Sequence, residues 1–154
     1  MKWRTNDIKQ YVQAKEYIDT ALIPLIPFSL SDDQQIKDLV FQKELMDVYV
    51  NHIEQQLKGR IFLLPEYYYL KDDKINEELT KLNRFTKHVH NQPFKYTFLI
   101  TFDREWRKVI KELDDVELLW IPSMKEGDLS QKETQKMIQS QVKEIEQLIM
   151  DSWN

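Results

Sequence analysis

Acidic, hydroxyl and aromatic side chains stand directly after the short apolar runs of this chain, and their types and positions could do chemistry. In an open parallel sheet a ligand binds outside the carboxyl ends of the strands, so side chains that follow different strands meet at one edge. Such an edge could form the pocket of a small enzyme or of a ligand-binding protein. The candidate ligand-binding residues are Glu66, Tyr68, Asp103, Arg104 and Ser123, and the loop after the last run adds Lys125, Glu126 and Asp128.

The acidic residues at this edge also have a purely structural explanation. Carboxylates at the start of a helix cap its free N–H groups and interact favourably with its dipole, which accounts for Asp32, Asp33, Asp72, Asp73 and Asp103 without a ligand. Asp32 or Asp33 together with Asp103 could instead bind a hard cation such as Mg²⁺. The lysine that a phosphoacceptor pocket requires after a further strand is missing, so we expect no metal.

Three successive tyrosines, Tyr67 to Tyr69, follow Pro65 and Glu66. Their stacking faces and hydroxyls make this segment the best guess for a binding surface. The alternative is that the segment extends the second strand, with Tyr67 and Tyr69 buried and Tyr68 exposed.

Several kinds of site are not expected from the residue types present. The chain has no cysteine, which excludes disulfides, thiolate nucleophiles and cysteine-based metal sites. Neither Gly59 nor Gly127 follows a strand in a phosphate-loop pattern. His88 and His90 point to different sides of a helix and have no third ligand nearby in the sequence. The serines lack the glycines of a nucleophile elbow, and we expect no cofactor.

The apolar runs predict the elements that position these residues. Four short runs, three of them closed by a proline, alternate with amphipathic stretches, which is typical of buried parallel strands joined by crossover helices. We predict strands from about 20 to 23, 60 to 64, 95 to 102 and 117 to 121. Right-handed crossovers give the order 2-1-3-4 in a three-layer, Rossmann-like α/β domain with an extra N-terminal helix. Because proline cannot donate to a ladder, the first strand either ends near Ile23 or has that side of its backbone unpaired, and Pro24 argues against a central position for it.

The longest predicted helix starts at a capping-box-like segment, 31–34, and ends before Gly59. One apolar stripe on it would lie on the sheet. Phe41, Leu45 and Val48 form a second stripe, which needs a cover. The cover is either the N-terminal helix with Trp3 or, as a candidate interface, a second subunit.

Composition and charge limit the class of protein. The 154 residues, 42% of them hydrophobic, fit one α/β domain over 1–154. The net charge is −4, and residues 113–154 hold four basic against nine acidic side chains, so we expect no nucleic-acid partner. No apolar run has the length of a signal peptide or a membrane span, so we expect a cytoplasmic protein with no membrane partner.

Met1-Lys2-Trp3, the segment 11–27 and Leu63-Leu64-Pro65 resemble the YpiF-like family of short, uncharacterised proteins from Gram-positive, often spore-forming bacteria. The resemblance covers the whole chain and is specific in the first thirty residues. It implies a stand-alone bacterial cytoplasmic protein with no established activity, and it supplies no site residues. The polar cluster Ala14-Lys15-Glu16-Tyr17 belongs to the same resemblance.

Two functions follow as hypotheses. The favoured one is a non-enzymatic interaction or regulatory module, with an unknown protein partner or as a homodimer, because no catalytic constellation is present. The alternative is a small enzyme or ligand-binding protein with its pocket at the carboxyl ends of the strands.

Overall fold

The computed structural model describes residues 1–124 and 129–154 and has strand β1, Thr20–Phe28, in the middle of a parallel sheet. The other strands are β2 (Ile61–Leu63), β3 (Tyr67–Leu70), β4 (Tyr96–Thr101) and β5 (Glu117–Trp120). Their order is β2-β1-β4-β5, and β3 also pairs with β1. The predicted order of four strands is therefore confirmed. The sheet has one further strand, β3, because the tyrosine segment pairs with the second half of β1.

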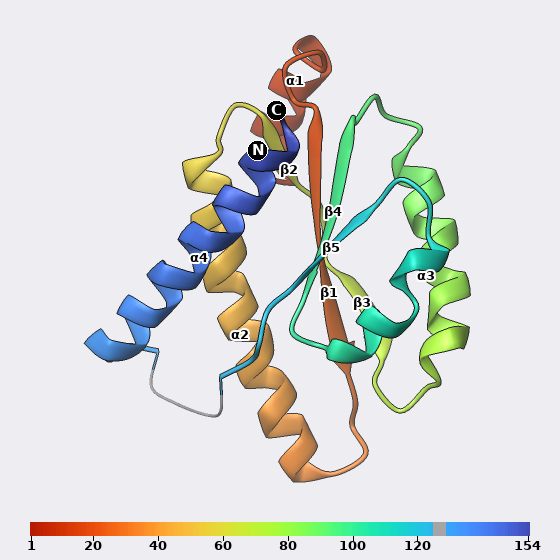
Figure 1. Ribbon diagram of the computed structural model, residues 1–154, viewed down its shortest axis with the longest axis vertical. Helices are drawn as coiled ribbons and strands as arrows, with labels where there is room; N and C mark the ends of the chain where they lie inside the picture. Colours follow the sequence, from red (N-terminus) through yellow and green to blue (C-terminus); the bar gives the residue numbers. More distant parts are fainter. Residues whose placement is uncertain (125–128) are drawn as a thin grey trace.

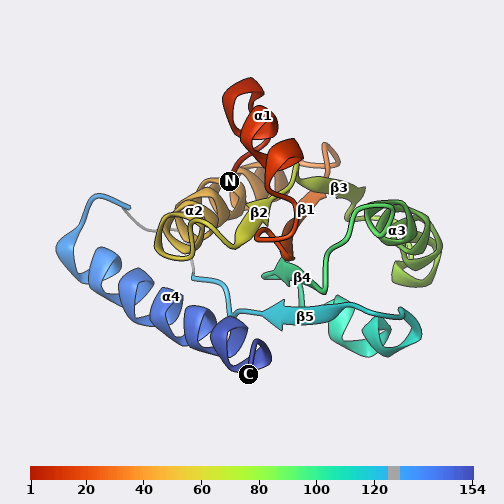
Figure 2. The same ribbon diagram turned by 90° about the horizontal axis from the view of Figure 1, so that it is seen from above.

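Helices cover both faces of the sheet, as the predicted three-layer architecture requires (Figures 1 and 2). One face carries α2 (Asp33–Gln56) and α4 (Lys132–Ser152). The opposite face carries α3 (Ile75–Val89) and two short 3-10 helices, Arg104–Lys108 and Ile110–Glu112. Helix α1 (Thr5–Gln13) lies at the end of the sheet formed by β2 (Figure 2). A regular helix was expected after Asp103, whose side chain does accept the N–H of Glu105, but the segment forms 3-10 turns instead.

The two prolines of β1 lie inside a central strand, although proline lacks the N–H that a ladder requires. Of the two alternatives, a strand that ends near Ile23 was wrong, whereas a strand left unpaired at Pro24 on one side is what the structure has. The inference that Pro24 opposes a central position was also wrong. The strand continues through Pro24 and Pro27 to Phe28.

The direction of each proline nitrogen explains why the sheet tolerates it. Main-chain groups of successive residues point to opposite sides of a strand, and Leu22 accepts a hydrogen bond from Leu64 at 3.0 Å on the β2 side. Position 24 faces the same side, at the gap between the end of β2 and the start of β3. Pro27 faces the β4 side, beyond the last paired residue of that ladder, Pro24 with Ile100. Neither missing N–H interrupts a ladder.

Strands β2 and β3 are two parts of one edge strand with a bulge between them. Thr20 pairs with Ile61, whereas Leu25 pairs with Tyr67, so the outer strand has one residue more than β1 over the same length. An extra residue turns every following side chain to the opposite face. Pro65 lies in this insertion.

Side chains of alternate residues form one hydrophobic core on each face of the sheet. Leu22 and Phe98 pack beneath α2 and α4, whereas Ile23 and Leu99 pack beneath α3 and the 3-10 helices. All four are at most 1% exposed. Burial of each such side chain contributes about 1.5–3 kcal/mol, so the two cores depend on the same central strands.

The second apolar stripe of α2 is covered by α4 and not by the N-terminal helix. Leu45 is completely buried, and Phe41 and Val48 pack partly buried against the core that contains Ile138 and Val142 of α4. The predicted second-subunit contact at Leu45 has no free surface to use, because helix α4 occupies it. In the residues that the structure describes, no helix has the length and apolar character needed to cross a membrane.

Candidate functional site

The first group of polar side chains lies beside α2 and contains two of the predicted site residues. Tyr68 donates a hydrogen bond to Glu66 at 2.9 Å, and the ammonium group of Lys43 lies 2.7 Å from Glu66 and 2.6 Å from Asp47. Burial alone would raise the pKa of Glu66, but the hydrogen bonds from Lys43 and Tyr68 outweigh it and hold this pKa below its usual range. Burial raises the pKa of Asp47. The charged side chains of this first group therefore pair with one another.

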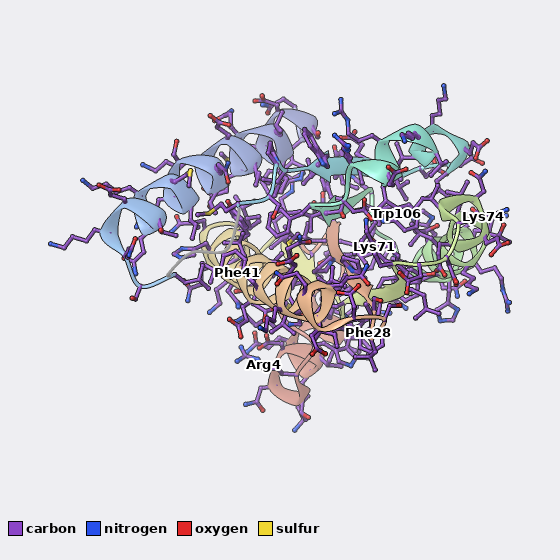
Figure 3. All side chains as sticks on the ribbon, turned by 90° about the horizontal axis from the view of Figure 1, so that it is seen from below. Arg4, Phe28, Phe41, Lys71, Lys74 and Trp106 are labelled. Carbon is purple, nitrogen blue, oxygen red and sulfur yellow. The ribbon has the colours of Figure 1, made fainter. Side chains whose placement is uncertain are left out.

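The second group is centred on Asp103, at the end of β4. Its carboxylate accepts hydrogen bonds from Tyr69 at 2.6 Å, from Lys71 at 3.0 Å and from the N–H of Glu105 at 3.0 Å. These donors outweigh the effect of burial, which would raise the pKa of Asp103, and keep it below its usual range. Figure 3 looks onto this end of the sheet and shows Lys71 and Trp106 near its middle. A carboxylate with three donors is a structural acceptor with little capacity left for a ligand.

The third group lies in the loop after β1. Ser29 donates to Asp72 at 2.9 Å, and Ser31 also donates to that carboxylate. These hydrogen bonds lower the pKa of Asp72. The group ties the loop after β1 to the turn after β3, so it holds the two loops of this edge together.

The five predicted ligand-binding residues therefore belong to different groups, and one of them, Asp103, is buried. Glu66 and Tyr68 belong to the first group and Asp103 to the second, whereas Arg104 and Ser123 are exposed. Tyr68 and Tyr69 belong to different groups because neighbouring strand residues point to opposite faces. Lys125, Glu126 and Asp128 lie outside the described residues. In residues 1–124 and 129–154, no three histidine or acidic side chains converge in a way that could hold a metal ion.

Partners from distant parts of the sequence complete these groups, and sequence reasoning missed them. Lys43 comes from the middle of α2 and Lys71 from the turn after β3. Tyr69 was considered for burial but not as a donor to Asp103. Had the tyrosine segment been paired in parallel with β1, the alternation of its side chains would have placed Tyr68 in the first group and Tyr69 in the second.

The tyrosine segment is a strand, so its interpretation as an extension of the second strand is confirmed. Tyr69 is 5% exposed, Tyr67 is half-buried and Tyr68 is 51% exposed. Leu70, on the same face as Tyr68, is 49% exposed. This strand thus presents an apolar surface on the α2 side.

The outer edge of β3 carries main-chain groups that no described residue pairs with. Lys71 donates its N–H to Phe28 of β1 at 2.9 Å, so positions 67, 69 and 71 face β1. Tyr68 and Leu70 therefore direct their N–H groups outward. The same alternation holds in β2, where Leu63 faces outward and donates to Met1 at 2.8 Å. Residues 1 and 2 cover the edge of β2. On β3 the outward N–H groups of Tyr68 and Leu70 have no partner among the described residues, whereas the carbonyl of Leu70 accepts the N–H of Asp73 at 3.2 Å.

Hollows accompany this open edge on both faces. A hollow of about 180 Å³ lies between β3 and the residues Glu78 and Lys81 of α3, and a second one on the α3 side, of about 410 Å³, contains Tyr67 and Phe85. On the α2 side a hollow of about 420 Å³ extends from Trp3 to Tyr68. Alternating main-chain groups between two rows of hollows are the geometry of a site for an added strand.

The other edge strand, β5, is protected in ways that β3 is not. Glu117 places an exposed charge at its start, and the guanidinium of Arg107 lies 4.5 Å from the centre of the Trp120 ring. Charged side chains on an edge discourage pairing with another chain. Exposed apolar side chains on β3 favour it.

The fold and these groups define a three-layer α/β protein with internally paired charges and an open edge strand. The chain belongs to the family described as "Protein of unknown function (DUF2487)", whose model matches residues 9–153. It is 36% identical over 107 residues to the uncharacterized protein YpiF of Bacillus subtilis (strain 168), which covers 70% of this chain and 69% of that protein. The resemblance to YpiF-like proteins is thus confirmed. No solved structure is significantly similar.

Proposed function

We propose that this protein is a non-enzymatic binding module that takes up an extended segment of a partner protein along β3. The observation that carries the proposal is the open edge of β3, where Tyr68 and Leu70 direct outward N–H groups that have no partner in residues 1–124 and 129–154, and where both residues are about half exposed. An added strand would form main-chain hydrogen bonds with these groups and bury apolar surface at the same time.

The polar groups near this edge support a binding role over a catalytic one. A general acid or base needs a proton position within reach of a substrate and a pKa near the working pH. Glu66 and Asp103 are instead bound to lysine and tyrosine donors, which stabilise their charged forms. Their pairing ties β3 to α2 on one face of the sheet and to the segment after β4 on the other.

A proline at position 70 tests the proposal. Leu70→Pro removes one outward N–H, whereas the N–H groups of Tyr69 and Lys71 that face β1 remain. The matched control, Leu70→Ala, removes the same apolar side chain and keeps the N–H. A phage-displayed library of random peptides is selected on the immobilised wild-type protein, and the enriched peptides are then measured on all three proteins by fluorescence anisotropy.

We expect to find peptides that bind the wild type. Their affinity should fall less than about tenfold on Leu70→Ala and more than about tenfold on Leu70→Pro. Hydrogen exchange provides a measurement that does not depend on the variants, since a bound peptide slows exchange at the amides of Tyr68 and Leu70. Either a library without enrichment or peptides that leave these amides unprotected would overturn the proposal.

A further inference from the structure

We infer that the segment bound along β3 alternates acidic and apolar side chains, an inference that rests on the proposed function. Successive side chains of an added strand point to opposite faces of the sheet. One set therefore lies against α3 and the other against α2. The two faces differ in charge, so each face favours a different kind of side chain on the bound segment.

The α3 face of the open edge is basic. Lys81, Arg84 and His88 recur at helical spacing and line one hollow together with Tyr67 and Phe85. Arg84 is exposed and forms no ion pair with any residue that the structure describes. A carboxylate on an added strand would be attracted to this side.

The acidic residue on the same face does not cancel this charge. Glu78 is 2% exposed and lies 3.4 Å from the ammonium group of Lys81. Its burial raises its pKa, so its charged form is weakened. Arg84 lies further along the helix, is exposed and has no acidic partner among the described residues, so its charge is available to a partner.

The α2 face is largely apolar and its few charges balance, because Lys2 lines the same hollow as Asp47 and Glu66. Its hollow is lined by Trp3, Pro24 and Leu63, together with Tyr68 of β3. Asp47 and Glu66 share the single ammonium group of Lys43 at its border. A charged side chain would lose hydration here, whereas a valine or leucine side chain would bury apolar surface.

Three fluorescein-labelled heptapeptides test the inference on the full-length protein. The first alternates glutamate with valine, the second alternates lysine with valine, and the third contains the residues of the first with all glutamates before the valines. We expect the first peptide to bind roughly tenfold more tightly than the second or the third, and this preference to weaken as salt is raised from 50 to 500 mM.

A charge reversal on α3 locates the preference. Arg84→Glu is expected to weaken binding of the glutamate peptide roughly fivefold and to strengthen binding of the lysine peptide. Lys87→Glu is the matched control, because it makes the same change at an exposed position of α3 that lines neither hollow on this face. It is expected to change either affinity less than twofold.

The outcomes separate this inference from the proposed function. Equal or tighter binding of the lysine peptide, with loss on Leu70→Pro, would overturn the acidic preference and leave the strand-binding function intact. If Leu70→Pro and Leu70→Ala weakened binding of the glutamate peptide equally, both the acidic preference and the strand-binding function would be overturned. A thymidine oligonucleotide that competes with the glutamate peptide at equal charge would show that the basic side chains act without the strand edge, and would also overturn the inference.

Discussion

At Asp103 a single carboxylate connects three segments of the chain. It accepts hydrogen bonds from Tyr69 of β3, from Lys71 after that strand and from the main chain after β4. Removal of the charge leaves buried donors without a strong acceptor, which is more costly than the loss of an exposed charge.

Asp103→Asn is therefore expected to lower the free energy of unfolding at pH 7 by about 2 kcal/mol. The pKa of Asp103 is lowered by folding, so its contribution is complete above the pKa of the unfolded chain and is lost as the pH falls below about 4. Urea unfolding between pH 3 and pH 7 measures both effects. Asp114→Asn, at an exposed position, should change stability by less than about 0.5 kcal/mol.

Tyr49 provides the opposite pH dependence, on the other face of the sheet. Its ring is completely buried, its hydroxyl donates to Gln141 of α4, and burial raises its pKa to about 12. The folded state therefore holds this proton more tightly than the unfolded state does. Its stabilising effect is complete below about pH 10 and is lost as the pH rises from 10 through 12.

We expect Tyr49→Phe to be less stable than wild type by about 1 kcal/mol at pH 7 and to lose less stability between pH 9 and pH 11.5. Thermal unfolding followed by circular dichroism over this range measures the difference. Tyr17→Phe, at a position that is 68% exposed, should follow the wild-type curve. Parallel curves for the wild type and Tyr49→Phe would contradict the assignment.

At the scale of elements, the sequence predicted the strand order, but not the length of β1 or the pairing of the tyrosine segment with its second half. The order follows from apolar runs and crossover handedness, which are local and general features. The path through Pro24 and Pro27 depends on which way each nitrogen points, and that direction is set by where the neighbouring strands end. A register of this kind involves three strands and cannot be read from one segment.

The same limit applied to the candidate site. Asp103 follows the end of β4, as the apolar runs indicate, but the faces of Tyr68 and Tyr69 depend on one extra residue near Pro65. Lys43 was missed because helical spacing places a residue on a face but does not show which distant loop that face meets.

Because of the pairing of β3 with β1, the rate of amide hydrogen exchange should alternate from residue to residue along β3. Amides of Tyr69 and Lys71 face β1, and those of Tyr68 and Leu70 face outward. In the free protein we expect the first pair to exchange at least about 100-fold more slowly than the second, because only the first pair is hydrogen-bonded. Hydrogen exchange followed by NMR resolves single amides. Equal rates along the strand would contradict the open edge.

At the scale of the whole molecule, the two cores share the central strands and should unfold together. Leu22 belongs to the core beneath α2 and α4, and its neighbour Ile23 to the core beneath α3. Both side chains are completely buried. Loss of packing on one face would release β1 and β4 and thereby remove the support of the other face.

Leu22→Ala and Ile23→Ala should therefore each lower the free energy of unfolding by about 3 kcal/mol, since both leave a cavity in a packed core. Circular dichroism reports on the helices of both faces. Fluorescence reports mainly on the tryptophans, among which Trp106 packs in the core of Ile23 and Trp153 against the core of Leu22. We expect coincident transitions by both methods in both variants, because the sheet couples its two faces through the same backbone. If Ile23→Ala showed an early fluorescence transition with the helical signal retained, the α3 face would be a separate unit, and the binding edge of β3 could then open without unfolding the core beneath α2.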